Sequence, residues 1–306
     1  MTNLRLIALD MDDTLLRSDL TVSFRTRNAL RKAMAKGVTV ALVSSRTPQA
    51  MDHFSRILGF NKKRGYLIAD NGGLVQESDT GAIIRDVKIP AAAALIIFDM
   101  ADAEGFAVQI YDDIMYISRS NEFAEYDQKI TGIRQVVVEN FRSMVAAGCR
   151  KMLIPGDPMT LAPLARLLES YAEGARIFST RPYLLEVLPP EVNKGSALAA
   201  VAEKLSIPPE AALAIGDSMN DEAMLRWAGF PVAMVNGDDR IKEIAALVTD
   251  KTNDEDGVAE IIERYVIEGK VIEGKMIEGK VIEGKVIEEK IIAGKDSRDQ
   301  GARADG

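Results

Sequence analysis

Residues 6–15 read Leu6-Ile7-Ala8-Leu9-Asp10-Met11-Asp12-Asp13-Thr14-Leu15, a short apolar run that ends in two acidic residues one position apart. Parallel strands that are buried on both faces read as continuous apolar runs. Open α/β sheets place their chemistry just beyond the carboxyl ends of such strands. Asp10 and Asp12 are therefore candidates for metal binding, nucleophilic attack and proton transfer. Taken alone, the two acids fit an acidic turn that caps the next helix better than they fit a reactive site.

Composition narrows the classes of protein to consider. The chain has 306 residues, 47% of them hydrophobic, and a formal net charge of −8. The acidic balance argues against a nucleic-acid or anionic-membrane partner, because such partners usually require a basic face. A single cysteine, Cys149, and a single histidine, His53, exclude an internal disulfide and a multi-histidine metal site. No signal peptide is recognisable and no apolar run approaches the roughly 18 residues of a membrane span. We expect a cytoplasmic protein.

Strand-type and helix-type segments alternate in the first third and again after residue 189. Apolar runs at 38–43, 66–69, 211–215 and 230–234 have strand character, and helices are expected to follow Ser23, Thr47 and Asn193. This alternation predicts an α/β fold with a parallel sheet and helices on both of its faces. Residues 78–81 read as a hairpin turn between two short strands.

A different pattern separates the two halves of this fold. A helix at 91–103 precedes strand-type segments at 106–111 and 115–118, and a helix at 159–172 precedes others at 175–178 and 184–188. About 100 residues is an ordinary domain size. We therefore predict an inserted α+β domain at 89–188, within a discontinuous core made of residues 1–88 and 189–265.

The end of the chain is repetitive. Residues 266–295 form a tandem array based on the pentapeptide Val-Ile-Glu-Gly-Lys. A period of five gives neither a helix nor a strand one apolar face, and recurring glycine weakens both. We predict that residues 266–306 form a low-complexity tail that lacks regular structure and takes no part in catalysis; a self-associating strand is the alternative.

Polar side chains of complementary chemistry stand at the ends of three predicted strands and at the start of one helix. They are Asp10 with Asp12, Ser44, Asp217 with Asn220 and Asp221, and the helix residue Lys194. The carboxyl ends of parallel strands meet at one edge of the sheet, so these groups should converge. Together they offer the positioning and charge neutralisation that phosphoryl transfer requires, with carboxylate oxygens of the kind that bind Mg²⁺.

This combination resembles the haloacid dehalogenase-like superfamily, and within it the Cof-type phosphatases with a large inserted cap. The resemblance covers about residues 3–265. Its motifs are Asp10-Met-Asp12-Asp-Thr14-Leu15, Ser44-Ser45-Arg46, Asn71-Gly72, Asn193-Lys194-Gly195 and Gly216-Asp217-Ser-Met-Asn220-Asp221. Each motif is weak alone. Five in this order make a specific pattern, which implies a Rossmann-like core sheet and a cap that closes over the site.

The resemblance also implies a role for each matched residue. Asp10 is expected to attack phosphorus and form an aspartyl-phosphate, and Asp12 to act as general acid and then as general base. The expected Mg²⁺ site consists of Asp10, Asp12 through its backbone carbonyl, Asp217 and Asp221. The expected substrate contacts are Ser44, Arg46, Asn71, Lys194 and Asn220.

The chain departs from the family pattern at two places. It has Asp13 where the family commonly has Gly, and Ser44-Ser45 where the family has Thr-Gly. Serine keeps the hydroxyl of threonine, so no required group is lost. The predicted function is Mg²⁺-dependent hydrolysis of a small phosphorylated metabolite, a sugar phosphate or similar compound. A phosphomutase of the same fold and a non-catalytic phosphoryl-accepting domain are the alternatives, and the motifs identify neither the alcohol nor the oligomeric state.

Overall fold

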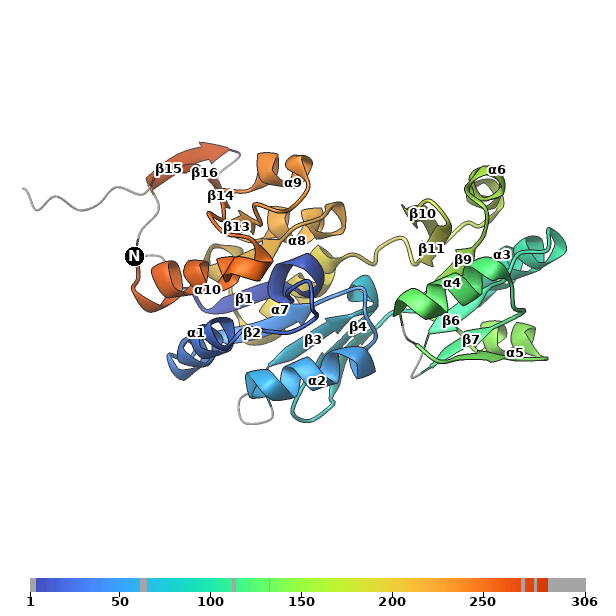
Figure 1. The fold of residues 1–306 in the computed structure, drawn as a ribbon, viewed down its shortest axis with the longest axis horizontal. Coiled ribbons are helices and arrows are strands. Elements are labelled where there is room, and N and C mark those ends of the chain that lie inside the picture. Colours follow the sequence, from blue (N-terminus) through green and yellow to red (C-terminus); the bar gives the residue numbers. More distant parts are fainter. Residues whose placement is uncertain are drawn as a thin grey trace, which may run out of the picture.

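The computed structural model describes residues 4–60, 65–111, 114–131, 133–270, 273–277 and 280–285. An eight-stranded sheet forms the larger part of the molecule (Figure 1). Its strands, in spatial order, are β14 (Leu247–Val248), β13 (Phe230–Ala233), β12 (Ala212–Gly216), β1 (Leu6–Asp10), β2 (Thr39–Val43), β3 (Tyr66–Ala69), β4 (Leu74–Glu77) and β5 (Ile83–Asp86). The strands from β14 to β3 are parallel, and β4 and β5 add an antiparallel edge.

Helices cover both faces of this sheet, which explains why β1 is apolar throughout. Ile7 and Leu9 pack on the side of α1 (Phe24–Ala35), α2 (Pro48–Leu58) and α10 (Gly257–Ile261). Leu6 and Ala8 pack on the side of α7 (Lys194–Leu205), α8 (Glu222–Trp227) and α9 (Asp239–Ile244). Successive residues of a strand point to opposite faces, so a sheet covered twice needs apolar residues at every position. The predicted α/β fold is confirmed.

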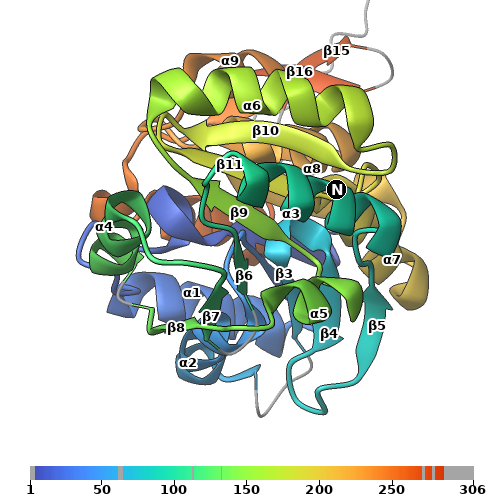
Figure 2. The same cartoon turned by 90° about the vertical axis from the view of Figure 1, so that its right-hand side faces the viewer.

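A second sheet of six strands lies beside the first (Figures 1 and 2). In spatial order its strands are β10 (Arg176–Arg181), β11 (Leu184–Leu188), β9 (Met152–Pro155), β6 (Gln109–Tyr111), β7 (Met115–Ile117) and β8 (Gln135–Val137). With its helices it occupies residues 91–188, and we refer to it as the inserted unit and to the larger sheet with its helices as the core. The chain passes from the core to the inserted unit after β5 and returns after β11.

The two faces of the smaller sheet are covered unequally. On one face, α3 (Ala91–Ala103), α5 (Phe141–Ala146) and α6 (Pro158–Tyr171) enclose an apolar cluster that includes Ile110 and Met152. On the other face, α4 (Glu122–Thr131) contributes Ala124 to a small cluster with Ala107 and Ile117. This second, less covered face carries the side chains that meet the core. None of the helices in the described part of the chain has the length and apolar character that a bilayer crossing needs.

The repeat array differs in part from our prediction. Residues 273–277 and 280–285 form the strands β15 (Glu273–Ile277) and β16 (Lys280–Lys285) of a two-stranded antiparallel sheet. We predicted no regular structure there because the period of five provides no apolar face. A hairpin, however, pairs its own backbone groups, and the β-branched Val and Ile of the repeat favour extended backbone. Residues 286–306 lie outside the described residues.

The backbone conformation of the turn after β1 explains why the family that this chain resembles commonly has glycine at position 13. Asp13 has φ +57°, in the left-handed region that costs an L-residue about 1–2 kcal/mol. We therefore expect Asp13→Gly to raise the free energy of unfolding by about 1 kcal/mol, measured by urea denaturation. Asp239→Gly, at an exposed position in α9, serves as the control. It should lower the free energy of unfolding, because glycine destabilises a helix. A clear loss of stability in Asp13→Gly would contradict the strain argument.

Candidate active site

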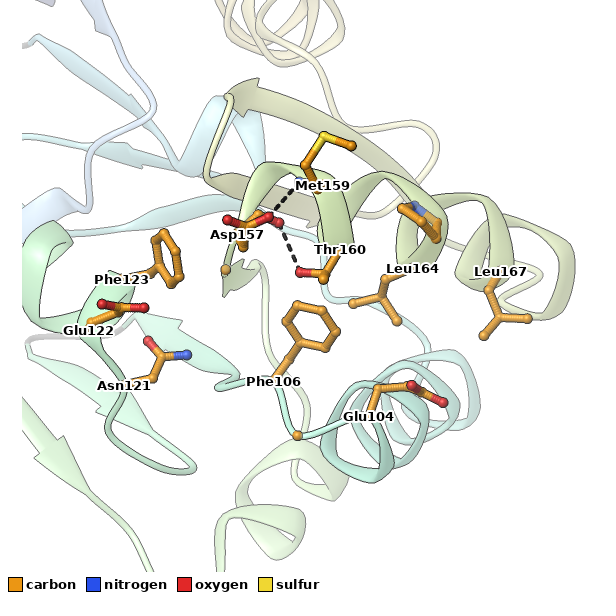
Figure 3. Close-up of a pocket in the computed structure, with 13 residues that line it drawn as sticks. Glu104, Phe106, Asn121, Glu122, Phe123, Asp157, Met159, Thr160, Leu164 and Leu167 are labelled. Carbon is orange, nitrogen blue, oxygen red and sulfur yellow. Dashed lines mark hydrogen bonds between the residues drawn. The ribbon is translucent and has the colours of Figure 1, made fainter.

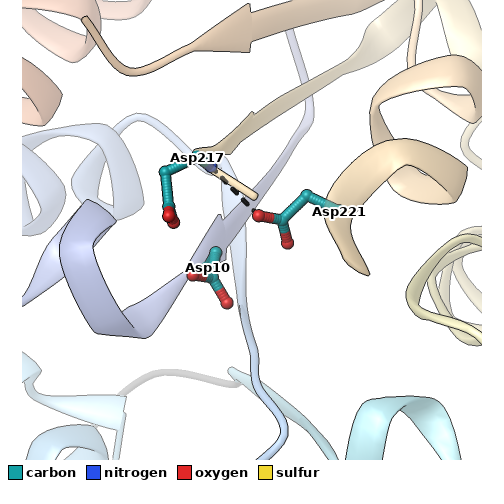
Figure 4. A group of neighbouring side chains, drawn as sticks. All are labelled: Asp10, Asp217 and Asp221. Atoms are coloured by element: carbon teal, nitrogen blue, oxygen red, sulfur yellow. Dashed lines mark hydrogen bonds between the residues drawn. The ribbon is translucent and has the colours of Figure 1, made fainter. Parts of the chain in front are cut away.

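Three carboxylates converge at the carboxyl edge of the parallel strands. Asp10 is the last residue of β1, Asp217 directly follows β12, and Asp221 lies one short turn later. Strands β1 and β12 are parallel neighbours, so their ends coincide. One oxygen of each carboxylate lies within 4.8 Å of the others, and the three groups point toward one another (Figure 4).

Lys194 stands at the centre of this group. As the first residue of α7 it is fixed by the helix start, where Asn193 accepts a hydrogen bond from the backbone N–H of Ser196. Its side chain is 1% exposed, and its ammonium donates to Asp10 Oδ1 at 2.5 Å, to Asp221 Oδ1 at 2.6 Å and to Asn220 Oδ1 at 2.9 Å. An ammonium has three donors, so all of them are engaged. A phosphoryl oxygen must replace one of these partners to contact Lys194.

Burial and mutual repulsion shift the pKa values of these groups. Burial, followed by the charge of Asp221, raises the pKa of Asp10 well above its ordinary value, although Lys194 acts in the opposite direction. Burial and Asp221 also raise the pKa of Asp217 to about 6. Burial alone would lower the pKa of Lys194, but Asp10 and Asp221 raise it above its usual range. The site therefore holds more negative charge than one lysine neutralises.

The chemistry of these side chains fits Mg²⁺, which binds hard oxygen ligands and needs only one or two carboxylates. Asp221 is the least available of the three. Its Oδ2 accepts the backbone N–H groups of Asp217 and Ser218 at 3.0 and 3.1 Å, and its Oδ1 accepts from Lys194. Asp10 and Asp217 are the better candidates for direct ligands. We predicted Asp221 as a ligand, and its contacts suit a residue that positions the others.

Thr14 contributes a contact that sequence reasoning did not assign. Its hydroxyl donates to Asp217 Oδ1 at 2.8 Å, and the residue is 1% exposed. The bond joins the turn after β1 to the loop after β12 and orients Asp217 within the site. In the sequence, Thr14 lies within a motif that carries the family resemblance. That position was the one available signal for a role in the site.

Asp12 and Arg46 form a bidentate ion pair at the edge of the site. Arg46 donates from Nε to Asp12 Oδ2 at 2.9 Å and from Nη2 to Asp12 Oδ1 at 2.5 Å. The side chain of Asp12 is 45% exposed, so a leaving group can reach it. We predicted Arg46 as a substrate contact. That stays a prediction: in the structure Arg46 lines the adjoining cavity and also holds the predicted general acid, so a phosphoryl group that approaches must compete with Asp12 for it.

Ser44 lies directly after β2 and is almost fully buried. Its Oγ accepts the backbone N–H of Arg46 at 3.1 Å, which leaves its own hydroxyl hydrogen available to donate. Its neighbour Ser45, rather than Ser44, is among the residues that line the adjoining cavity. The structure thus places Ser44 at the predicted edge but sets it back from the open space.

A cavity of about 500 Å³ lies between this edge and the inserted unit. From the core it is lined by Asp12, Leu20, Ser45, Arg46, Thr47, Ala50, Asp70, Asn71 and Asn220. From the inserted unit it is lined by Tyr111, Asp127, Ile133, Lys151, Leu153, Phe178, Arg181, Leu184 and Glu186. Sequence reasoning named none of the second group. The one signal was Glu186, an acidic residue inside the apolar run of β11.

A chain of polar contacts crosses the cavity wall. Asn71, which has φ +57° and is 6% exposed, donates from Nδ2 to Glu186 Oε2 at 3.2 Å. The same oxygen of Glu186 lies 3.0 Å from the ammonium of Lys151, and both side chains are more than nine-tenths buried. Asn71, which we predicted as a substrate contact, therefore joins the core to the inserted unit.

A larger cavity, of about 730 Å³, lies wholly within the inserted unit among α3, α4 and α6 (Figure 3). Phe106, Leu164 and Leu167 supply much of its apolar surface, and Asp157 caps α6 by accepting the backbone N–H of Met159 at 2.8 Å. It contains none of the residues that we predict for chemistry.

Residues 7–262 match the family described as haloacid dehalogenase-like hydrolases. The chain belongs to this family. The match covers the core and the inserted unit and leaves out the repeat array, so the predicted family is confirmed and the protein is a hydrolase by membership.

Individual relatives agree with this assignment. The chain is 32% identical over 87% of its length to a Bacillus subtilis protein named 5-amino-6-(5-phospho-D-ribitylamino)uracil phosphatase, of which it covers 97%. It is 29% identical over 76% of its length to an Escherichia coli HMP-PP phosphatase, of which it covers 84%. A crystal structure of a haloacid dehalogenase-like hydrolase from Bacteroides thetaiotaomicron superposes with a TM-score of 0.79 at 28% identity, and covers 85% of this chain and 99% of its own.

Proposed function

We propose that this protein is a Mg²⁺-dependent phosphomonoesterase that acts on a small phosphorylated metabolite, a sugar phosphate or similar compound, through an aspartyl-phosphate on Asp10. The observation that carries the proposal is the position of Asp10. It is buried at the end of β1, bound to Lys194, and grouped with Asp217 beside a cavity that also contains Asp12. The phosphatase names of the relatives support the same reaction class.

In this proposal the nucleophile and the proton carrier are separate residues. A carboxylate oxygen of Asp10 forms a bond to phosphorus while the bond from phosphorus to the leaving alcohol breaks, and Asp12 gives the alcohol its proton. Water then attacks the aspartyl-phosphate, Asp12 takes a proton from that water, and the carboxylate of Asp10 is restored. Mg²⁺ held by Asp10 and Asp217, with the backbone carbonyl of Asp12, would neutralise charge on the phosphoryl oxygens.

Two cations of the chain can assist by exchanging partners. Arg46 is paired with Asp12, and a dianionic phosphoryl group is a stronger partner for its planar guanidinium. Transfer of Arg46 to the phosphoryl group would free Asp12 for proton transfer. Lys194 can likewise give up Asn220 to contact a phosphoryl oxygen while it continues to hold Asp10 and Asp221. Both exchanges use residues that already line or adjoin the cavity.

A phosphate-release screen tests the proposal. The full chain is incubated with a panel of phosphorylated sugars, sugar alcohols and heterocyclic alcohols, with Mg²⁺ and with a chelator, and inorganic phosphate is measured. We expect release from at least one ester with Mg²⁺ and loss of that release with the chelator. Conversion of a sugar phosphate to its isomer without free phosphate would identify a phosphomutase instead, and no turnover of any ester would contradict the proposal.

The raised pKa of Asp217 gives a pH-dependent prediction. Its pKa is about 6, above the ordinary value of 3.8, so the folded state favours the protonated form. The contribution of Asp217 to the free energy of unfolding is therefore fully present below pH 3.8. It is lost as the pH rises through 6. In chelator at pH 8, Asp217→Asn should therefore raise the free energy of unfolding, by at most about 3 kcal/mol. The same variant should lose Mg²⁺-dependent turnover.

Urea denaturation at two pH values measures this effect. The stability difference between Asp217→Asn and the parent should be largest at pH 8 and should shrink at pH 4.5. Asp99→Asn is a suitable control, because Asp99 is an exposed acid paired with Arg142 and remote from the site. A metal-free Asp217→Asn protein less stable than the parent at pH 8 would contradict the pKa argument.

A further inference from the structure

Leu20 has a backbone conformation that leucine rarely adopts. Its φ is +61°, in the left-handed region that favours glycine. Among non-glycine residues with positive φ in the described part of the chain, most are Asp, Asn or Ser, whose short polar side chains can bond locally. A leucine has no such compensation. The strain at Leu20 must therefore be imposed by its surroundings.

The surrounding loop fixes this conformation through several hydrogen bonds. The backbone N–H of Leu20 donates to the carbonyl of Arg17 at 2.8 Å, and that of Arg17 donates to the carbonyl of Thr21 at 2.9 Å. Asp254 accepts the backbone N–H and the hydroxyl of Ser18 at 2.9 and 2.6 Å. Strained residues persist where neighbouring contacts over-determine them, and they concentrate at functional sites.

Packing within the protein does not explain why the strained residue is a leucine. The residue is 56% exposed, so its side chain gains little from burial in the folded protein. It does, however, line the cavity of about 500 Å³ that contains Asp12 and Arg46. An exposed apolar side chain held at the edge of a reaction cavity becomes buried when a ligand fills that cavity.

The opposite wall of the cavity is part apolar and part polar. Its polar residues are Tyr111, Asp127, Lys151, Arg181 and Glu186. Four residues of the inserted unit line it with hydrocarbon or aromatic surface: Ile133, Leu153, Phe178 and Leu184. A polyol pressed against these four side chains would lose hydrogen bonds to water, and each unsatisfied hydroxyl costs about 1–3 kcal/mol by protein mutational data. A planar ring avoids this cost, because its faces are apolar while its edge can bond to Lys151 and Glu186.

We infer that Leu20 is a specificity-determining residue that packs against the apolar face of the leaving group, and that the preferred substrates are phosphate esters of alcohols that carry a planar aromatic or heteroaromatic ring. This inference rests on the proposed phosphomonoesterase function and replaces the general substrate named there, a sugar phosphate or similar compound, with a narrower class for that same site. The phosphoryl group lies at the carboxylate cluster. The ring of the alcohol lies between Leu20 on the core and the apolar side chains of the inserted unit.

The test compares two substrates and three variants of the full chain with Mg²⁺. Benzyl phosphate supplies a planar aromatic ring, and glucose 6-phosphate supplies a polyol whose ring is puckered and carries hydroxyl groups. For Leu20→Gly and Leu20→Asn we expect kcat/KM for benzyl phosphate to fall about tenfold, mainly through KM, because an apolar contact of this size is worth about that factor. For glucose 6-phosphate kcat/KM should change by less than about threefold. Phe24→Ala removes a side chain that is 75% exposed and does not line the cavity, so it should alter neither value.

Thermal unfolding separates a specificity role from a structural one. Glycine adopts a positive φ freely and asparagine tolerates it, so neither variant should have a lower Tm than the parent. A parent that hydrolyses glucose 6-phosphate better than benzyl phosphate overturns the substrate class. Equal losses on both esters, or none on benzyl phosphate, overturn the role of Leu20. A parent that releases phosphate from no ester of the broader panel contradicts the proposed function itself, and this inference with it.

Discussion

Asp10→Asn is expected to lower Mg²⁺-dependent hydrolysis of p-nitrophenyl phosphate by at least about 10³-fold, because an amide cannot form the covalent intermediate. The change keeps the size and shape of the side chain. It also removes a buried negative charge from a group of three neighbouring carboxylates, so the metal-free fold should tolerate it. Initial rates at saturating substrate, with circular dichroism to confirm folding, measure the effect.

This result would distinguish a nucleophile from a residue that only binds metal. A metal ligand changed to its amide commonly retains some turnover when the metal concentration is raised. Asp10→Asn should show no such rescue up to the solubility limit of Mg²⁺, whereas the surface variant Asp99→Asn should behave as the parent. Turnover within a factor of about ten of the parent would exclude Asp10 as the nucleophile.

Lys194→Met is expected to have the largest effect on stability. It would leave Asp10 and Asp221 buried without their cation, and loss of one partner from a buried ion pair costs about 3–5 kcal/mol. Turnover should fall as well, because the variant cannot neutralise the phosphoryl group. Urea denaturation in chelator measures the first effect, and phosphate release measures the second.

A double variant tests the reason for this instability. If uncompensated negative charge destabilises Lys194→Met, then Asp221→Asn in the same chain should restore part of the lost stability. Mg²⁺ should also restore part of it, since a cation can take the place of the ammonium charge. If the effects of the two substitutions on stability add, the double variant will be less stable than Lys194→Met alone. That result would show that packing rather than charge is responsible.

The fold was predictable where a segment is buried on both faces. Strands β1, β3 and β11 were located within one residue of their ends, because continuous apolar runs bounded by polar residues define them. The stretch from α4 to β9 was much less clear. Strand β8 is partly exposed and only three residues long, and α5 has six residues, so neither carries enough periodicity to be recognised.

The residues of the candidate site that lie at the strand ends of the core could be predicted from the sequence. The residues that line the cavity from the inserted unit could not. Topology alone brings Asp10 and Asp217 to one edge of the sheet. Pairing between side chains far apart in the chain leaves no local pattern, as with the bond of Thr14 to Asp217 over 203 positions. The contacts of Glu186 depend on how the two sheets face each other. No motif within β11 encodes that arrangement.

The hydrogen bond between Asn71 and Glu186 has a consequence for product release. A hydrogen bond to a charged group is worth about 1.5–3 kcal/mol net, which corresponds to a preference for the joined arrangement of about ten- to 150-fold. The ion pair of Arg150 with Asp70, at 2.9 Å, joins the same two parts of the chain and adds to that preference. In the function proposed above, release of the alcohol and of phosphate through this wall would require both contacts to break.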